Sequence, residues 1–401
     1  MGSFSFLTIA DYPTFDNKNE YYREVVNHLF LPEDFVCEKR PFSSKNKLYW
    51  GDAYNDEKGK FFFKGFRQTA GICKRRLEIF GTNLLSVKLD WDNAKVKASE
   101  NNWYSAEYDF NIKRVSFTAY RKELANILTN KIITYEQERD NLHNSLIADG
   151  LVICGQSIPE SLYSILSLVP DEAIVEYDLT DISAAGWIKA EKVKDDIRFE
   201  KIIILTEGRS DSEILKSTLK LLYPELFPYY HFLDFGGFKV EGGASALVRT
   251  VKAFAAANVN HPIIALFDND TAGISEMCKI PKKLPNNIKA LKLPDIEIAK
   301  NFATLGPTGI AKVDVNGMAC GIEMYLGVEV LSKNGQFPLI RWSSFDNGLQ
   351  KYQGYFENKD ELQSRFWQFV KDGKEWPMPE MKLIWESIFN AFCSVGNKDL
   401  T

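Results

Sequence analysis

Two carboxylates, Asp268 and Asp270, directly follow an apolar run in the segment "HPIIALFDNDTAG". Ile263 to Phe267 is an uninterrupted apolar stretch of the length expected for a strand that is buried on both faces. Because residues two apart in a strand point the same way, both aspartates should converge at its carboxyl end, where open α/β sheets bind ligands. Neighbouring carboxylates repel each other, so we expect a proton or a cation between them.

A second acidic pair follows another apolar run. The segment "IIILTEGRSD" places Glu207 immediately before Gly208, with Asp211 four residues after the glutamate. We expect Gly208 to form the sharp turn from strand to helix, and Asp211 to lie at the start of that helix. Asp234 in "LDFGGF" should lie at a comparable height, and Glu323 in "VNGMACGIEMYLG" precedes an apolar helical turn.

A cluster of these acids at one sheet edge would suit a hard divalent cation. All-oxygen ligands favour Mg²⁺ or Mn²⁺ over zinc. Two such ions about 4 Å apart are a common device for cleaving phosphodiesters: one polarises the phosphate and activates water, and the other stabilises the leaving oxygen. The simpler alternative is that the acids only begin helices and form a turn. Their occurrence after two separate buried strands favours metal binding.

From residue 201 the pattern alternates regularly between strands and helices. Such alternation predicts an α/β fold with a mostly parallel sheet flanked by helices. The predicted strands are "KIIILTEG", "YHFLDFGG", "HPIIALF" and "NIKALKLP", and the predicted helices are "SDSEILKSTLKLLY", "ASALVRTVKAFAAA" and "TAGISEMCKI". We predict that this domain spans residues 200–330 and that residues 331–401, which include "PEMKLIWESIFNAFC", form a mostly helical C-terminal cap.

Residues 1–196 mix short strands and helices, which predicts an α+β N-terminal domain. The predicted helices are "NKNEYYREVVNHLF", "FRQTAGICKRRLEIFG" and "TYEQERDNLHNSLIADG", and the predicted strands are "NKLYWGD", "GKFFFKGF" and "AIVEYDLTDI". The charged stretch "KAEKVKDDIRFEK" at residues 189–201 is the expected linker to the next domain.

The composition is that of a globular protein in a reducing compartment. Hydrophobic residues make up 45% and charged residues 26% of the 401 positions. We find no apolar run long enough to cross a bilayer and no signal peptide, and the six cysteines are scattered without a CxxC pair, so we expect a cytoplasmic protein without a membrane partner. The net charge of −5 does not point to nucleic acid, but a local basic groove and bound cations can offset it.

Residues 201 to about 327 resemble a Toprim domain. The family pattern is a strand-terminal Glu-Gly, an Asp four residues after the Glu, and a later DxDxxG. Its counterparts here are Glu207-Gly208, Asp211 and the run Asp268 to Gly273. The segment "GIEMYLG" is similar to the acidic motif of the nuclease branch of this superfamily, the overcoming-lysogenization-defect type, where a second metal is bound.

The N-terminal region also carries a resemblance. From "GSFSFLTIADY" to "YDLTDISAAGWI" it is similar to the domain found ahead of HEPN or Toprim modules in bacterial defence proteins. That resemblance implies a role in defence against phage or other foreign nucleic acid.

The Toprim resemblance implies a role for each acid. Glu207, Asp268 and Asp270 would be the catalytic residues and would bind the first divalent ion, with Glu207 as ligand or general acid/base. Asp211 and Glu323 would bind the second ion. Gly208 and Gly273 would be structural turn residues. Some nucleases of this branch also place a lysine near the phosphate, and the sequence does not choose among Lys292, Lys300 and Lys312.

Together these features predict a nuclease that uses Mg²⁺ or Mn²⁺, with two bound ions, to hydrolyse DNA or RNA. A first alternative is a regulatory module that binds nucleic acid without turnover, or only after activation by a separately encoded partner such as an ATPase. A second is topoisomerase-type or primase-type phosphotransfer, although the chain is short for a strand-passing gate and carries no GxxxxGK phosphate-binding loop. Homo-oligomerisation is compatible with the sequence, and no nucleic-acid-binding residue is assigned.

Overall fold

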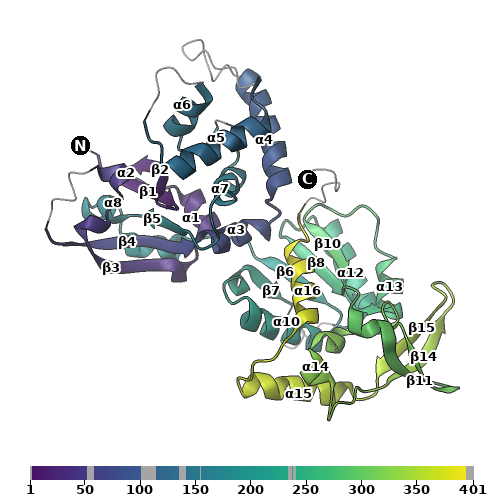
Figure 1. The fold of residues 1–401 in the computed structure, drawn as a ribbon. Helices are drawn as coiled ribbons and strands as arrows, with labels where there is room; N and C mark the ends of the chain where they lie inside the picture. The colour runs from purple at the N-terminus through teal and green to yellow at the C-terminus, as the bar shows by residue number, and fades with distance from the viewer. Residues whose placement is uncertain are drawn as a thin grey trace. The chain divides into compact units, whose positions relative to one another are not determined.

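The computed structural model describes residues 2–51, 58–100, 114–134, 141–153, 155–233, 237 and 241–393. The chain divides into two compact units, residues 1–199 and residues 200–392 (Figure 1). The division falls inside the charged stretch that the sequence predicts as a linker. Residues 331–392 belong to the second unit and do not form a unit of their own. None of the described helices is long and apolar enough to span a membrane.

The first unit contains a five-stranded antiparallel sheet in the order β2-β1-β5-β4-β3. Its strands are β1 (Phe4–Ile9), β2 (Tyr12–Lys18), β3 (Phe35–Pro41), β4 (Lys60–Thr69) and β5 (Ile174–Asp178). Its helices are α1 (Arg23–Leu29), α2 (Lys47–Trp50), α3 (Ala70–Glu78), α4 (Leu84–Glu100), α5 (Phe117–Asn130), α6 (Asn141–Ala148), α7 (Ile158–Leu166), α8 (Thr180–Ala184) and α9 (Ala190–Val193). The mixed α+β character predicted for this region is confirmed.

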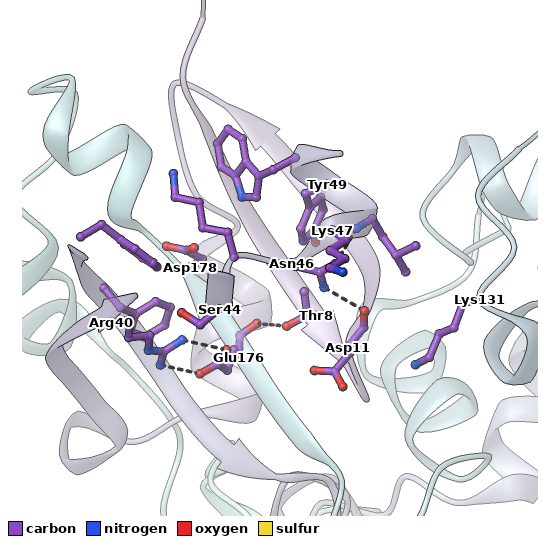
Figure 2. A pocket seen from close by; sticks show the side chains of 15 residues that line it. Thr8, Asp11, Arg40, Ser44, Asn46, Lys47, Tyr49, Lys131, Glu176 and Asp178 are labelled. Carbon is purple, nitrogen blue, oxygen red and sulfur yellow. Dashed lines mark hydrogen bonds and ion pairs between the residues drawn. The ribbon is translucent and has the colours of Figure 1, made fainter. Parts of the chain in front are cut away.

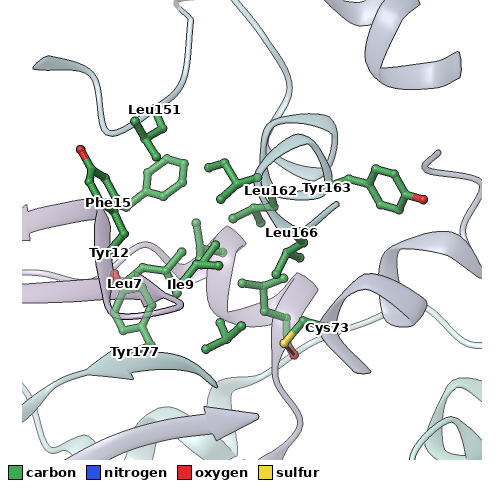
Figure 3. Close-up of a cluster of buried hydrophobic side chains, with 14 of the residues drawn as sticks. Leu7, Ile9, Tyr12, Phe15, Cys73, Leu151, Leu162, Tyr163, Leu166 and Tyr177 are labelled. Carbon is green, nitrogen blue, oxygen red and sulfur yellow. Dashed lines mark hydrogen bonds between the residues drawn. The ribbon is translucent and has the colours of Figure 1, made fainter. Parts of the chain in front are cut away.

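One face of this sheet carries the hydrophobic core of the unit. Alternate residues of β1, Leu7 and Ile9, are fully buried, as is Tyr177 of β5. Figure 3 shows them together with Leu162 and Leu166 of α7. Because neighbouring residues in a strand point to opposite faces, the residues between these apolar positions lie on the other face of the sheet.

Two local predictions in this unit are wrong. The segment "NKLYWGD" forms the helical turn α2 and not a strand: the Asn46 side chain accepts a hydrogen bond from the Leu48 backbone N–H at 2.9 Å, and Gly51 ends the turn with a φ of 66°. The aromatic residues of that segment imitate strand alternation, but the cap and the glycine decide the conformation. The helix predicted from "FRQTAGICKRRLEIFG" begins only at Ala70, because the residues before it continue β4.

The second unit is built on a four-stranded parallel sheet in the order β10-β8-β6-β7. Its strands are β6 (Ile202–Thr206), β7 (Tyr230–Phe232), β8 (Ile263–Phe267) and β10 (Ile288–Lys292), connected by α10 (Arg209–Leu222), α12 (Ala244–Ala256) and α13 (Thr271–Met277). The predicted α/β alternation with a parallel sheet is therefore confirmed. A short pair, β9 (Asn269–Asp270) and β13 (Ala319–Cys320), and a 3₁₀ turn, η8 (Ile322–Tyr325), lie beyond β8.

Helices pack against the parallel sheet through apolar side chains. Leu247 and Val251 of α12 share a buried cluster with Ile263 and Phe267 of β8. The C-terminal helix α16 (Pro379–Phe389) packs on α10, and the indole N–H of its Trp385 lies 3.3 Å from Thr218 Oγ1. The predicted packing role of this last helix is thereby confirmed.

The prediction of a mostly helical tail is only partly right. The tail contains a hairpin of β14 (Ile340–Asp346) and β15 (Lys351–Phe356), which extends a sheet in the order β12-β11-β14-β15 with β11 (Phe302–Gly306) and β12 (Gly309–Val313). The helices of this region are α14 (Val328–Leu331), α15 (Lys359–Lys371) and α16. The Asp346 side chain accepts from the Leu349 backbone N–H at 2.8 Å and so closes the turn of the hairpin.

A buried ion pair ties α3 to the loop before β3 in the first unit. The Arg76 guanidinium lies 2.5 Å from Asp34 Oδ2 and also donates to the Leu29 carbonyl oxygen at 2.7 Å. Both side chains of the pair are almost completely buried. Removing one partner of such a pair leaves an uncompensated buried charge.

We predict that Asp34→Ala destabilises the first unit by about 3–5 kcal/mol, the usual cost of breaking a buried ion pair. Asp171→Ala is the matched control, because the Lys74–Asp171 pair is exposed on the aspartate side and should contribute about 1 kcal/mol at most. Hydrogen exchange of peptides from residues 1–199 in the full chain measures both effects. Equal losses of protection in the two variants would contradict this prediction.

Candidate active site

Glu207 and Asp268 meet at the carboxyl edge of the parallel sheet. β6 and β8 run in the same direction with Thr206 opposite Leu266, so both chains leave the sheet at one edge. The backbone N–H of Asp268 donates to Glu207 Oε1 at 2.9 Å. This bond joins two motifs that lie 61 residues apart in the sequence.

The two motif glycines make room for the acids. Gly208 has an extended backbone with a φ of −145°, which any residue can adopt, but a Cβ there would lie 3.3 Å from Asp211 Oδ2. A Cβ on Gly273 would lie 2.7 Å from the Asp268 carbonyl oxygen and 2.8 Å from Glu207 Oε1. Gly208 directly precedes α10 and Gly273 lies in the first turn of α13, and at both positions the absence of a side chain leaves room for the acids.

Glu323 reaches the same edge through the β9–β13 pair. This antiparallel pair places the start of η8 beside the end of β8. Glu323 is buried, with 1% of its surface exposed. A Cβ on Gly321 would lie 3.1 Å from Glu323 Oε2 and 3.5 Å from Asp268 Oδ2, so both carboxylates border the space beside this glycine.

Asp270 uses both carboxylate oxygens within the protein. Oδ1 accepts from the Gly273 backbone N–H at 2.7 Å and caps α13, as in the simpler interpretation of the motif. Oδ2 accepts from the Gln353 side-chain amide at 2.7 Å. The same amide accepts from the Ala272 backbone N–H at 2.8 Å, so β15 is joined to the start of α13.

Helix α15 contributes a cation that the sequence did not reveal. The Lys359 ammonium lies 3.1 Å from Glu323 Oε1, and the Gln363 amide donates to the same oxygen at 2.6 Å. Burial alone would lower the pKa of Lys359, but attraction by the surrounding carboxylates, with Glu323 foremost, raises it above the ordinary value. Lys359 and Gln363 lie four residues apart, so both side chains are on one face of the helix. This spacing is the only sign of their role in the sequence, and it does not indicate what that face contacts.

The three lysines considered from the sequence make other contacts. Lys292 forms an ion pair with Asp295 at 2.7 Å and donates a hydrogen bond to Asn269 Oδ1 at 3.1 Å. Asn269 is the residue between Asp268 and Asp270 in the sequence. Lys300 forms an ion pair with an acid three residues before it, and Lys312 lies on the exposed strand β12. Asp234, the remaining acid considered at this edge, is outside the described residues.

Burial and mutual repulsion raise the pKa values of three acids. Burial raises the pKa of Glu207 to about 7, and repulsion by nearby aspartates adds to the rise. The hydrogen bond from the Asp268 N–H acts in the opposite direction and lowers this pKa. Burial raises the pKa of Asp211 to about 6, although attraction to Lys359 opposes it. Part of Asp268 reaches solvent, yet burial and the neighbouring acids raise its pKa well above the ordinary range. The cluster therefore carries more negative charge than its surroundings compensate.

The donor chemistry suits a hard divalent cation, but the present positions of the side chains do not enclose one. Among the described residues, no three His, Cys, Asp or Glu side chains are grouped closely enough to hold a metal ion. Glu323 instead contacts Lys359 and Gln363, and Asp270 contacts Gln353. An ion could bind only if some of these contacts gave way.

Comparison with known protein families covers the first unit. The model of the family HEPN/Toprim N-terminal domain 1 matches residues 1–201. Comparisons with curated proteins and with solved structures found no match. The matched segment ends immediately before β6, so it does not include the strands that carry the acids.

We predict that the metal-free second unit loses stability as pH rises. Glu207 has an ordinary pKa of 4.5 and a pKa of about 7 in the folded chain, so folding favours its protonated form. Its contribution is full below about pH 4.5 and is lost as pH rises through about 7, and Asp211 acts in the same sense with a folded pKa of about 6. The melting temperature in EDTA should therefore fall between pH 5 and 8.

Glu207→Gln should flatten this pH dependence, because the glutamine keeps an acceptor for the Asp268 N–H and does not ionise. Exposed Glu329→Gln is the control and should leave the profile as in the wild type. A Glu207→Gln profile as steep as that of the control would show that Glu207 does not hold a proton in the folded protein.

Proposed function

The chain belongs to the HEPN/Toprim N-terminal domain 1 family, and from this premise we propose that residues 200–392 form a Toprim-type nuclease that hydrolyses phosphodiester bonds in DNA or RNA with divalent metal ions. The observation that carries the proposal is the cluster of buried carboxylates at the carboxyl edge of a parallel sheet. A role in bacterial defence against phage agrees with the modules after which the family is named.

The proposed roles follow the positions of the acids. Glu207, Asp268 and Asp270 would hold one ion, and Asp211 and Glu323 would hold the second. Bound Mg²⁺ or Mn²⁺ would polarise the phosphate and lower the pKa of a water molecule. The raised pKa values support this assignment, because these carboxylates gain most from a nearby positive charge.

Two side chains would handle protons and charge during cleavage. If Glu207 does not bind the ion, it could instead act as the general acid or base, because its pKa of about 7 in the metal-free chain allows both protonation states near neutral pH. The Lys359 ammonium already lies among the carboxylates, where it can contact a phosphate oxygen if it leaves Glu323.

A second candidate is a binding module that does not cleave, or cleaves only after a partner acts on it. Contacts from Lys359 and Gln363 hold Glu323, and no three acids enclose a metal position among the described residues. A separately encoded partner, such as an ATPase, would then activate the site by shifting α15. This alternative keeps the same acids but makes the present arrangement a resting state.

We predict that the purified protein degrades nucleic acid in Mg²⁺ or Mn²⁺ and that Asp268→Asn lowers the rate on the order of 10³-fold, the loss typical of a removed electrostatic catalytic group. Labelled single-stranded and double-stranded DNA and RNA are the substrates, and exposed Glu329→Gln is the control. Equal rates in wild type and Asp268→Asn would refute the catalytic assignment. Binding by both without cleavage by either would favour the binding module.

We also predict that Lys359→Met raises the affinity for Mn²⁺ about tenfold in the absence of nucleic acid, which corresponds to about 1.4 kcal/mol. Without the ammonium, Glu323 would lose its internal cation and the cluster would gain negative charge. Lys371→Met, at an exposed position of the same helix, is the control. Titration calorimetry measures both, and an unchanged affinity in Lys359→Met would show that the lysine and the ion do not compete.

A further inference from the structure

The first unit contains a cavity of about 350 Å³ on the sheet face opposite its hydrophobic core (Figure 2). Thr8 of β1 and Glu176 of β5 point to this side because each lies between two core residues. The segment of residues 44–50, which includes α2, forms another wall, and Lys131 follows α5. The volume lies within the usual range for small-molecule sites.

Ion pairs hold the floor of the cavity in place. The Arg40 guanidinium contacts the Glu176 carboxylate at 2.7 and 3.3 Å, and Arg67 Nε contacts the same carboxylate at 2.7 Å. Arg40 also lies 3.5 Å from the centre of the Phe63 ring. These contacts fix the polar groups of the floor before any ligand arrives, which reduces the entropy cost of binding.

Aromatic rings surround a cation at one end of the cavity. Lys45 Nζ lies 4.6 Å from the ring centre of Trp50, 5.2 Å from that of Phe61 and 5.5 Å from that of Phe42. Phe61 lies opposite Arg40 in the β3–β4 register, which places these rings at the Arg40 end. Ring faces of this kind attract cations and also stack with planar bases.

Basic side chains lie at the other end. Figure 2 shows Lys47, Lys131 and Asp11 on one side of the cavity and Arg40 and Asp178 on the other. Lys131 donates to a backbone carbonyl, and within the part of the chain that the structure describes the exposed Lys47 ammonium has no partner. Lys47 is therefore able to take an anion without losing an internal contact.

We propose that this cavity binds a nucleoside phosphate. The base would stack on the rings of Trp50 and Phe61 in place of the Lys45 ammonium, and the phosphate would contact Lys47 and Lys131. Sugar hydroxyls would donate to Glu176 or Asp178 on the floor between them. Four basic and three acidic side chains line the cavity, and this small positive excess suits a monophosphate better than a more highly charged polyphosphate.

The ligand could come from two sources with this same chemistry. A free mononucleotide and the 5′-phosphorylated end of a nucleic acid chain both present a base, a sugar and a phosphate. The site lies wholly within residues 1–199, and the test is made in EDTA, so its outcome does not depend on whether the second unit cleaves nucleic acid.

The test is calorimetric titration of the full chain with AMP, GMP, CMP and UMP, and with adenosine and inorganic phosphate as partial ligands. We expect at least one monophosphate to bind more tightly than either partial ligand. Trp50→Leu and Lys47→Ala should each weaken that binding about tenfold, equivalent to about 1.4 kcal/mol. The controls are Trp187→Leu and Lys122→Ala, both at exposed positions of the same unit, and they should bind as the wild type does.

A tetranucleotide with a 5′-phosphate, compared with its 5′-hydroxyl form, separates the two sources. Displacement of the mononucleotide by the phosphorylated form alone would identify a chain end as the ligand, and displacement by neither would identify a free nucleotide. The proposal is overturned if no monophosphate binds at millimolar concentration, or if Lys47→Ala binds as tightly as Lys122→Ala. Because Lys47 is exposed, its variant decides the matter even if Trp50→Leu does not fold.

Discussion

Repulsion among buried carboxylates is the constraint that organises the second unit. The parallel register of β6 and β8 brings Glu207 and Asp268 to one edge, and the β9–β13 pair adds Glu323. The chain cannot bury this charge without compensation. Hydrogen bonds and the Lys359 ammonium supply part of it in the structure described here, and the raised pKa of Asp268 favours a bound proton. A divalent ion would supply it more completely.

The segment after residue 331 is part of this compensation. Gln353 on the hairpin and the pair Lys359 and Gln363 on α15 all contact carboxylates of the cluster. The tail therefore belongs to the candidate site, although the sequence predicts it to be a separate cap. The side chains that stabilise the acids without a metal are also the ones that an incoming ion would displace. If Mg²⁺ or Mn²⁺ binds here as proposed, this competition would link occupancy of the site to the position of α15.

Local patterns were enough to predict the sheet and its acids, because each strand, its turn and its carboxylate lie within a few consecutive residues. They were not enough for Lys359, since nothing around it indicates that it contacts Glu323, 36 residues earlier. The hairpin could have been predicted, because "FDNGLQKY" places a turn between aromatic residues. In "NKLYWGD" a short apolar run with two aromatic residues was outweighed by the Asn46 cap, so such short patterns are weak evidence for a strand.

Buried charges are neutralised within the protein in the first unit but not fully in the second. This difference distinguishes charged side chains that stabilise the fold from those that we propose to bind a ligand. Arg76 and Asp34 neutralise each other and make further internal hydrogen bonds, so a ligand would add nothing to them. Among the described residues, the acids around Asp268 outnumber the lysine that contacts them, Lys359. Uncompensated buried charge costs stability, and a chain that keeps it at a sheet edge gains from that charge only when a ligand binds.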